Sequence, residues 1–127
     1  MFKVLLVFVG SGVGGVLRLA LTEGIQRFAG PSFPLGTLTV NVLGCLAMGI
    51  LGGAFAGQTH IRDEHRLLLM VGLLGGFTTF SAFGRETVAL ADDGRLLLAG
   101  LNIALSNGLG LGAIWLGGWL AGRLHIN

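Results

Sequence analysis

Residues 75–83 read Gly-Gly-Phe-Thr-Thr-Phe-Ser-Ala-Phe and lie inside an apolar stretch that is long enough to cross a membrane. The glycine pair weakens a helix, because glycine loses more backbone entropy on ordering than any other residue. The hydroxyl groups of Thr78, Thr79 and Ser81 then follow where lipid favours apolar side chains. Non-helical backbone inside a bilayer must be buried in protein or line a polar path. The segment therefore predicts a small polar pathway near the membrane centre, lined by aromatic rings.

The composition of the whole chain indicates an integral membrane protein. Its 127 residues are 53% hydrophobic and 11% charged, whereas a soluble domain carries about 25% charged residues. Glycine contributes 24 residues without a Gly-X-Y period, and small residues allow membrane helices to pack closely. Cys45 is the only cysteine, so no disulfide can form within the chain. The net charge of +2 gives no argument for nucleic acid.

The apolar runs predict an all-α membrane protein in which residues 1–127 form a single domain of four transmembrane helices. A spanning helix needs roughly 20 mainly apolar residues, which places the four at about 4–22, 35–57, 66–90 and 96–124. The third helix is expected to be broken in mid-membrane near the glycine pair. A secretory signal peptide over the first 20 residues is an alternative interpretation of the first span, but three further spans and its glycine spacing favour a membrane helix.

The basic residues divide equally between the two sides that four spans define. One side holds Lys3, Arg62, Arg66 and Arg123, and the other holds Arg18, Arg27, Arg85 and Arg95. An excess of Lys and Arg on one side orients a membrane protein, so this balance predicts insertion in both orientations. Because a closed two-fold interface is the commonest symmetry, the expected assembly is an antiparallel, dual-topology homodimer with its axis in the membrane plane.

Two pairs of side chains are expected to share helix faces inside the membrane. Thr37 and Asn41 are spaced i, i+4 on the second span. An amide in lipid is costly unless it is paired, so Asn41 either bonds a neighbouring helix or donates to a permeating anion. Phe80 and Phe83 share a face of the third span, and the positive edges of their rings attract an anion weakly. No acidic residue lies in the apolar centre of a span, which argues against a cation or proton pathway.

Three further polar residues are candidates for the same pathway. Arg18 lies near the end of the first span, where it either extends to the headgroups or has a functional role. Glu86 lies near the mouth of such a pathway, and either pairs with Arg85 or Arg18 or is solvated. Ser106 is spaced i, i+4 from Asn102 on the fourth span and is a candidate extension of the polar track.

Three blocks of sequence resemble the Fluc/CrcB family of fluoride channels. They are Gly12-Val13-Gly14-Gly15-Val16-Leu17-Arg18, Gly36-Thr37-Leu38-Thr39-Val40-Asn41, and residues 75–83. The last two blocks are specific in combination, and the length and four-span layout agree from end to end. The resemblance implies a dual-topology antiparallel homodimer in the cytoplasmic (inner) membrane of a bacterium. It also implies two pores, each built from both subunits, through which fluoride leaves the cell passively, so that the cell resists fluoride.

The resemblance also implies roles for individual residues. The pore would be formed by Asn41, Phe80, Phe83, Thr37 and Ser81, with Glu86 near an entrance. The hydroxyl groups of Thr79 and Ser106, which the sequence itself points to, are expected to line the same pore. Arg18 is expected to act structurally or electrostatically. The backbone carbonyls of Gly75 and Thr78 are expected to hold a structural Na⁺ at the dimer interface. Ala82, Gly110 and Ile114 depart from the family pattern, since each replaces a hydroxyl side chain.

Three alternative functions and one alternative assembly stay open. A proton-coupled multidrug exporter shares the layout, but it would carry an acidic residue well inside the first span, where residues 4–17 have none. A membrane enzyme would need clustered catalytic groups, which the sequence does not offer, so no catalytic activity is expected. A non-conducting scaffold explains the glycines but not the convergence of Asn, Thr and Phe. A heterodimer of non-identical subunits is an alternative assembly.

Overall fold

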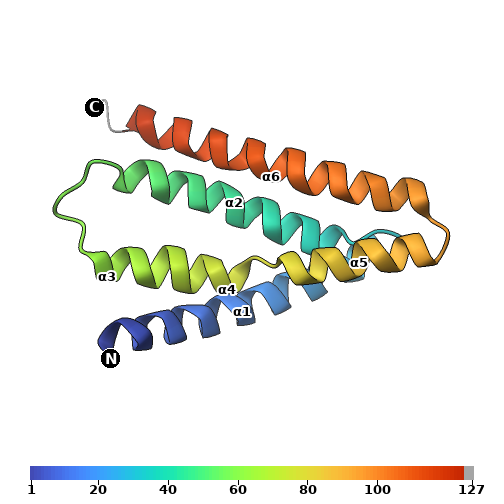
Figure 1. The fold of residues 1–127 in the computed structure, drawn as a ribbon, viewed down its shortest axis with the longest axis horizontal. Helices are drawn as coiled ribbons and strands as arrows, with labels where there is room; N and C mark the ends of the chain where they lie inside the picture. Colours follow the sequence, from blue (N-terminus) through green and yellow to red (C-terminus); the bar gives the residue numbers. More distant parts are fainter. Residues whose placement is uncertain (125–127) are drawn as a thin grey trace.

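The computed structural model describes residues 1–124, which are α-helical apart from short connections (Figure 1). Four helical stretches within them are long and apolar enough to cross a membrane. The elements are α1 (Phe2–Ala29), α2 (Leu35–Phe55), α3 (Asp63–Arg66), the π-helical stretch η1 (Leu67–Leu74), α4 (Gly75–Phe77), α5 (Phe80–Asp92) and α6 (Leu96–Leu124). The third span comprises α3 to α5, and the expected four-span architecture with a broken third helix is confirmed. Residues 125–127 of the expected domain lie outside the described residues.

The first helix extends well beyond its expected end near residue 22 and stops only at Ala29. The expectation followed the end of the apolar run, whereas a helix continues through polar residues until a breaker stops it. Gly30 supplies that breaker with a φ of 78°, a left-handed conformation that favours glycine, and Pro31 follows it. The last turns of α1 therefore extend beyond the apolar run of the first span.

The side chain of Gln26 organises the connection between α1 and α2. Its Nε2 donates to the carbonyls of Gly30 and Phe33, and its Oε1 accepts from the Gly36 N–H at 3.1 Å. The last of these bonds satisfies one of the N–H groups that the first turn of a helix leaves without an intrahelical partner. Gln26 thus fixes the start of α2, immediately before Thr37.

The break in the third span lies at Thr78 and Thr79, just after the glycine pair and not within it. Both residues are extended, with φ and ψ of −88° and 159° at Thr78 and of −151° and 118° at Thr79. The Oγ1 of Thr79 accepts from the N–H of the third residue of α5 at 3.2 Å and so caps this helix. Gly76 remains helical and serves close packing, because a Cβ there would strike the backbone of Ser11 in α1.

Close contacts between glycines and backbone hold the helices together. In Figure 1, α2 lies between α6 and the third span, and α1 packs along η1 and α4. A Cβ at Gly49 would strike the backbone of Ile114 in α6, and one at Gly14 would strike the backbone of Leu73 in η1. These contacts agree with the expected role of glycine in membrane packing.

The two ends of the bundle match the expected sides of the membrane. The N-terminus, the connection between α2 and α3 and the last turns of α6 lie at one end, and the other two connections lie at the opposite end (Figure 1). At the first end, Arg66 donates to the Phe55 carbonyl at 2.7 Å, and the Arg123 guanidinium lies 4.4 Å from the centre of the Trp119 ring. Arg66 and Arg123 are therefore held at this end of the bundle, beside the last turns of α2 and α6.

Candidate functional site

Asn41, in the second turn of α2, holds the broken segment of the third span through a pair of hydrogen bonds. Its Nδ2 donates to the Thr79 carbonyl at 2.9 Å, and its Oδ1 accepts from the Thr79 N–H at 2.7 Å. The pair satisfies two backbone groups that the break removes from the helical ladder inside the apolar bundle. An amide nitrogen carries two hydrogens and the bond to Thr79 uses one, which leaves the second for a ligand. The expected bond to a neighbouring span is thus observed, and donation to an anion stays a prediction.

The break also redirects the N–H groups that a continuous helix would supply to the carbonyls of Gly75 and Thr78. The Thr79 N–H, four residues after Gly75, donates to Asn41. The Ala82 N–H, four residues after Thr78, donates to the Thr79 side chain. Both carbonyl oxygens are thus released from the regular i, i+4 pattern, and such oxygens are the ligands that hard cations prefer.

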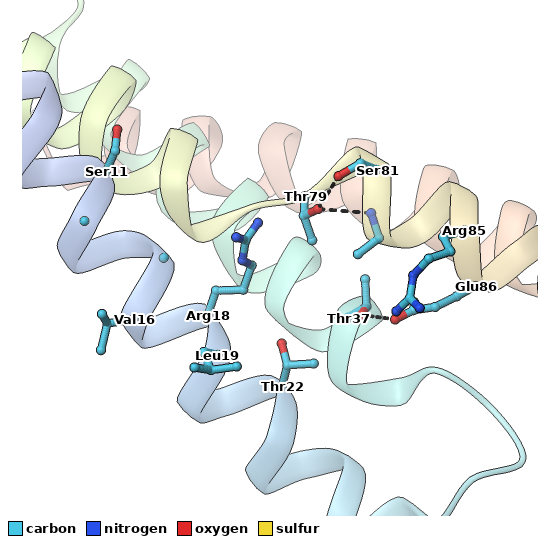
Figure 2. A pocket seen from close by; sticks show the side chains of 13 residues that line it. Ser11, Val16, Arg18, Leu19, Thr22, Thr37, Thr79, Ser81, Arg85 and Glu86 are labelled. Carbon is cyan, nitrogen blue, oxygen red and sulfur yellow. Dashed lines mark hydrogen bonds between the residues drawn. The ribbon is translucent and has the colours of Figure 1, made fainter.

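Arg18 lies against the break. Its Nη1 donates to the Thr78 carbonyl at 3.4 Å, and Figure 2 shows the side chain pointing from α1 toward the third span. The expected alternative, in which Arg18 extends to the headgroups, is not the arrangement observed. A guanidinium group in this position places a positive charge beside the polar segment, where a charged side chain most often has a function.

Thr37 joins α2 to α5 through Glu86. The Thr37 side chain is buried, and its Oγ1 donates to Glu86 Oε1 at 2.7 Å. Within residues 1–124, Glu86 bonds Thr37 in place of the ion pair with Arg85 or Arg18 that the sequence left open. Its second oxygen, Oε2, is buried without a hydrogen-bond partner in this part of the chain. A buried oxygen without a partner marks a place for water or a ligand.

A cavity of about 740 Å³ opens between α1 and α5 (Figure 2). The polar residues that line it include Arg18, Thr37, Thr79, Ser81, Arg85 and Glu86. Two guanidinium groups and one carboxyl group thus line this cavity. Because low-dielectric walls focus the field of charges in a cleft, the excess of positive groups is expected to favour small anions there.

The rings of Phe80 and Phe83 lie together, with centroids 5.4 Å apart and planes inclined by 46°, which confirms their expected common face. They line a second cavity of about 310 Å³, together with Asn41, Thr79 and Ser106. Among the described residues that line it, none is charged. Phe80 is 82% exposed in the single chain, so its ring must meet lipid or a second protein chain.

Thr79 lines both cavities. Its Oγ1 lies 3.3 Å from Ser81 Oγ, so the two hydroxyl groups lie side by side in the wall of the first cavity. The sequence-predicted site residues are divided between the cavities. The first contains Arg18, Thr37, Ser81 and Glu86, and the second contains Asn41, Phe80, Phe83 and Ser106.

Several residues that line these cavities were not predicted as site residues, and three of them are Thr22, Arg85 and Cys45. Thr22 and Arg85 line the first cavity, and Cys45 lines the second. Thr22 and Cys45 could have been predicted from helical spacing. Thr22 follows Arg18 at i, i+4, and Cys45 follows Asn41 at i, i+4, so each shares a helix face with a predicted site residue.

Comparison with known proteins identifies the family. Residues 5–118 match the model described as "CrcB-like protein, Camphor Resistance (CrcB)". A fluoride-specific ion channel FluC of Rhizobium etli is 43% identical over 117 residues, which are 92% of this chain and 94% of that protein. Proteins of the same name are 42% identical over 118 residues in Methylobacillus flagellatus, covering 92% of each chain, and 40% identical over 121 residues in Phocaeicola vulgatus, covering 95% and 99%. With its four apolar helices, the chain is a multi-pass bacterial membrane protein, and it belongs to the CrcB-like family.

Proposed function

We propose that this protein is a fluoride-selective ion channel that lets fluoride leave the cell passively across the cytoplasmic membrane, with no catalytic step. The observation that carries the proposal is the pair of cavities that share Thr79 in their walls, the first lined by two guanidinium groups and the second lined by no charged residue among those described. The printed names of the relatives supply the identity of the ion. A positive mouth followed by a neutral path of weak donors suits a small anion and disfavours a cation.

In the proposed mechanism, Arg18 and Arg85 offset part of the cost of removing fluoride from water in the first cavity. The hydroxyl groups of Ser81 and Thr79 then replace some of its hydration. In the second cavity the free amide hydrogen of Asn41 and the edges of the two Phe rings continue this role. Because ring edges attract an anion only weakly, the ion is stabilised without being trapped, as conduction requires.

Growth in fluoride tests the export function. Production of this protein in a bacterium that lacks its own fluoride exporter is expected to restore growth in medium containing fluoride. An empty vector serves as control, and the amount of protein in the membrane is measured alongside. Sensitivity equal to that of the empty vector, from protein that reaches the membrane, would contradict the proposal.

We further propose that the functional unit is an antiparallel homodimer with two pores, each built from residues of both subunits. The equal division of Lys and Arg between the two sides supports insertion in both orientations. The exposed ring of Phe80 supports a second chain at this face, because a pore residue needs protein around it. A two-fold interface would close each pathway with the partner's copy of the same surface.

Two added arginines in the connection between α2 and α3 are expected to abolish the activity of the homodimer. Thr59→Arg with His60→Arg changes two exposed residues and biases every subunit to one orientation, which prevents antiparallel pairing. Fluoride efflux from cells is the measurement, and Thr59→Gln with His60→Gln is the uncharged control. Co-production with an Asp92→Arg, Asp93→Arg chain, biased the opposite way, is expected to restore efflux. Full activity of the first variant alone would contradict the antiparallel dimer.

A structural sodium ion is part of the proposed dimer. The carbonyls of Gly75 and Thr78 fit such an ion, because the N–H groups four residues later donate elsewhere. Two carbonyls from each of two chains would supply four oxygen ligands for a hard cation. When bound, the ion would supply positive charge that holds the two breaks together, and it would not permeate. Arg18, which donates to the Thr78 carbonyl, would share that oxygen with it.

Removal of sodium is expected to lower the melting temperature of the purified dimer. A ligand that binds only the folded state stabilises it by about 2.7 kcal/mol at 100 times its dissociation constant. Melting in NaCl is compared with melting in N-methylglucamine chloride at the same ionic strength, and subunit association is followed by cross-linking. The same melting temperature and association in both salts would show that the carbonyls of the break hold no sodium.

A further inference from the structure

Asn102 of α6 is the most buried polar side chain of the described residues. It is 2% exposed, and with Val40 it is one of the two large side chains that are fully buried there. An amide in an apolar span costs several kcal/mol unless it is hydrogen-bonded. Its partners therefore define its role.

The hydrogen bonds of Asn102 form a chain whose direction is fixed. Thr87 Oγ1 donates its single hydrogen to the Phe83 carbonyl at 2.7 Å, so it accepts from Asn102 Nδ2 at 2.9 Å. The amide nitrogen thus points to α5 and leaves Oδ1 for the other direction. Ser106 Oγ donates to that oxygen at 3.4 Å. The order is Ser106, Asn102, Thr87 and the Phe83 carbonyl.

The two ends of this chain, Phe83 of α5 and Ser106 of α6, both line the second cavity, whereas Asn102 and Thr87 do not line it. The contact between α5 and α6 is smaller than that between α2 and α6, and within the described residues the bond from Asn102 to Thr87 is the side-chain hydrogen bond that links α5 with α6. We propose that Asn102 is a positioning residue that, through Thr87, sets the separation of Phe83 from Ser106 and thereby the discrimination of the pathway against larger anions. The inference rests on the proposed fluoride function and adds to it a selectivity determinant that does not touch the ion.

A narrow path forces an anion to lose water and to contact ring edges and hydroxyls on both sides, which favours the smallest halide. Loss of the hydrogen-bonded chain lets α5 and α6 separate, so a larger and more weakly hydrated anion passes with less penalty. The expected signature is a change in the fluoride-to-chloride permeability ratio, which a purely stabilising role of Asn102 does not produce.

The test is the reversal potential of the reconstituted dimer under opposed fluoride and chloride gradients. Wild type is measured first, and a wild type without fluoride conductance would overturn the proposed function and this inference together. In a conducting protein, Thr87→Val, which keeps the shape but removes the hydroxyl, and Asn102→Leu are each expected to lower the permeability ratio about tenfold, the size of effect of one hydrogen bond. Thr87→Ser retains the hydroxyl and is expected to keep the wild-type ratio.

Leu90→Ala is the control for stability, since Leu90 is buried on α5 but lines neither cavity. It is expected to lower the melting temperature without changing the ratio. Should Asn102→Leu fail to fold, the comparison of Thr87→Val with Thr87→Ser decides alone. An unchanged ratio in a conducting Thr87→Val protein, or an equal change in Thr87→Ser, would overturn the positioning role while leaving the fluoride channel intact.

Discussion

Phe80→Ile is expected to reduce fluoride efflux from liposomes about tenfold while the dimer stays intact. The substitution removes a ring edge from the second cavity and breaks the pair with Phe83, whose centroid lies 5.4 Å away. Specific interactions of an aromatic ring are worth about 0.5–1.5 kcal/mol, and 1.4 kcal/mol corresponds to about tenfold. Because isoleucine keeps most of the apolar volume, the fold has no reason to change. Efflux is measured with a fluoride electrode, and the dimer by cross-linking.

Phe28→Ile provides the matched control. Phe28 lies in the last turn of α1, is 98% exposed and lines neither cavity. The same chemical change there is expected to leave efflux at the wild-type rate. Unchanged efflux in Phe80→Ile would remove this ring from the pathway, and an equal loss in both variants would assign the effect to bilayer insertion.

Asn41→Leu is expected to abolish efflux and to lower the melting temperature strongly. It leaves the Thr79 N–H and carbonyl without the bonds of 2.7 and 2.9 Å that hold the break. Each buried polar group left unpaired costs about 1–3 kcal/mol. The whole segment around Thr79, which lines both cavities, is therefore expected to rearrange. Melting in detergent and efflux in liposomes are measured on the same preparation.

Asn41→Asp separates the two roles of this side chain. A carboxylate oxygen still accepts from the Thr79 N–H, but it cannot donate to the carbonyl or to an anion. The variant is expected to melt above Asn41→Leu and yet to conduct no fluoride, because it places negative charge in an anion path. Wild-type melting of Asn41→Leu would show that the bonds to Thr79 do not hold the break. Wild-type efflux through Asn41→Asp would remove Asn41 from the anion path.

The spans and the site faces could be predicted because they follow from local patterns. Apolar length gave the four membrane helices, and the spacings of Thr37 with Asn41 and of Phe80 with Phe83 identified groups that the structure brings to the cavities. The predicted end of α1 was wrong. The length of an apolar run reflects the thickness of the lipid that it crosses, whereas the helix itself continues until Gly30 and Pro31 terminate it.

The position of the break could not be read from local propensity. The glycine pair is the obvious weak point, yet it stays helical because Gly76 packs against Ser11. The break falls where Asn41, far away in the sequence, supplies replacement partners to Thr79. Tertiary hydrogen bonds thus decided between neighbouring candidate positions.

The partners of buried polar groups were equally hidden from the sequence. Glu86 was expected to pair with an arginine or with water, and instead accepts from Thr37. Asn102 was noted only for its spacing to Ser106, although its bond to Thr87 crosses to another helix. Spacing shows which residues share a face but not which helix that face meets.

Fluoride efflux from liposomes that contain the purified protein tests the central claim most directly. The liposomes are loaded with fluoride or, in parallel, with chloride, and the ion released is followed with the corresponding electrode. Valinomycin and an outward potassium gradient provide the countercurrent. If the positively charged cavity and the uncharged cavity form a fluoride path, fluoride release is expected to be rapid and to depend on valinomycin. Chloride release is expected not to exceed that of protein-free liposomes. Absence of fluoride release from a folded dimer, or equal release of both anions, would contradict a fluoride-selective channel.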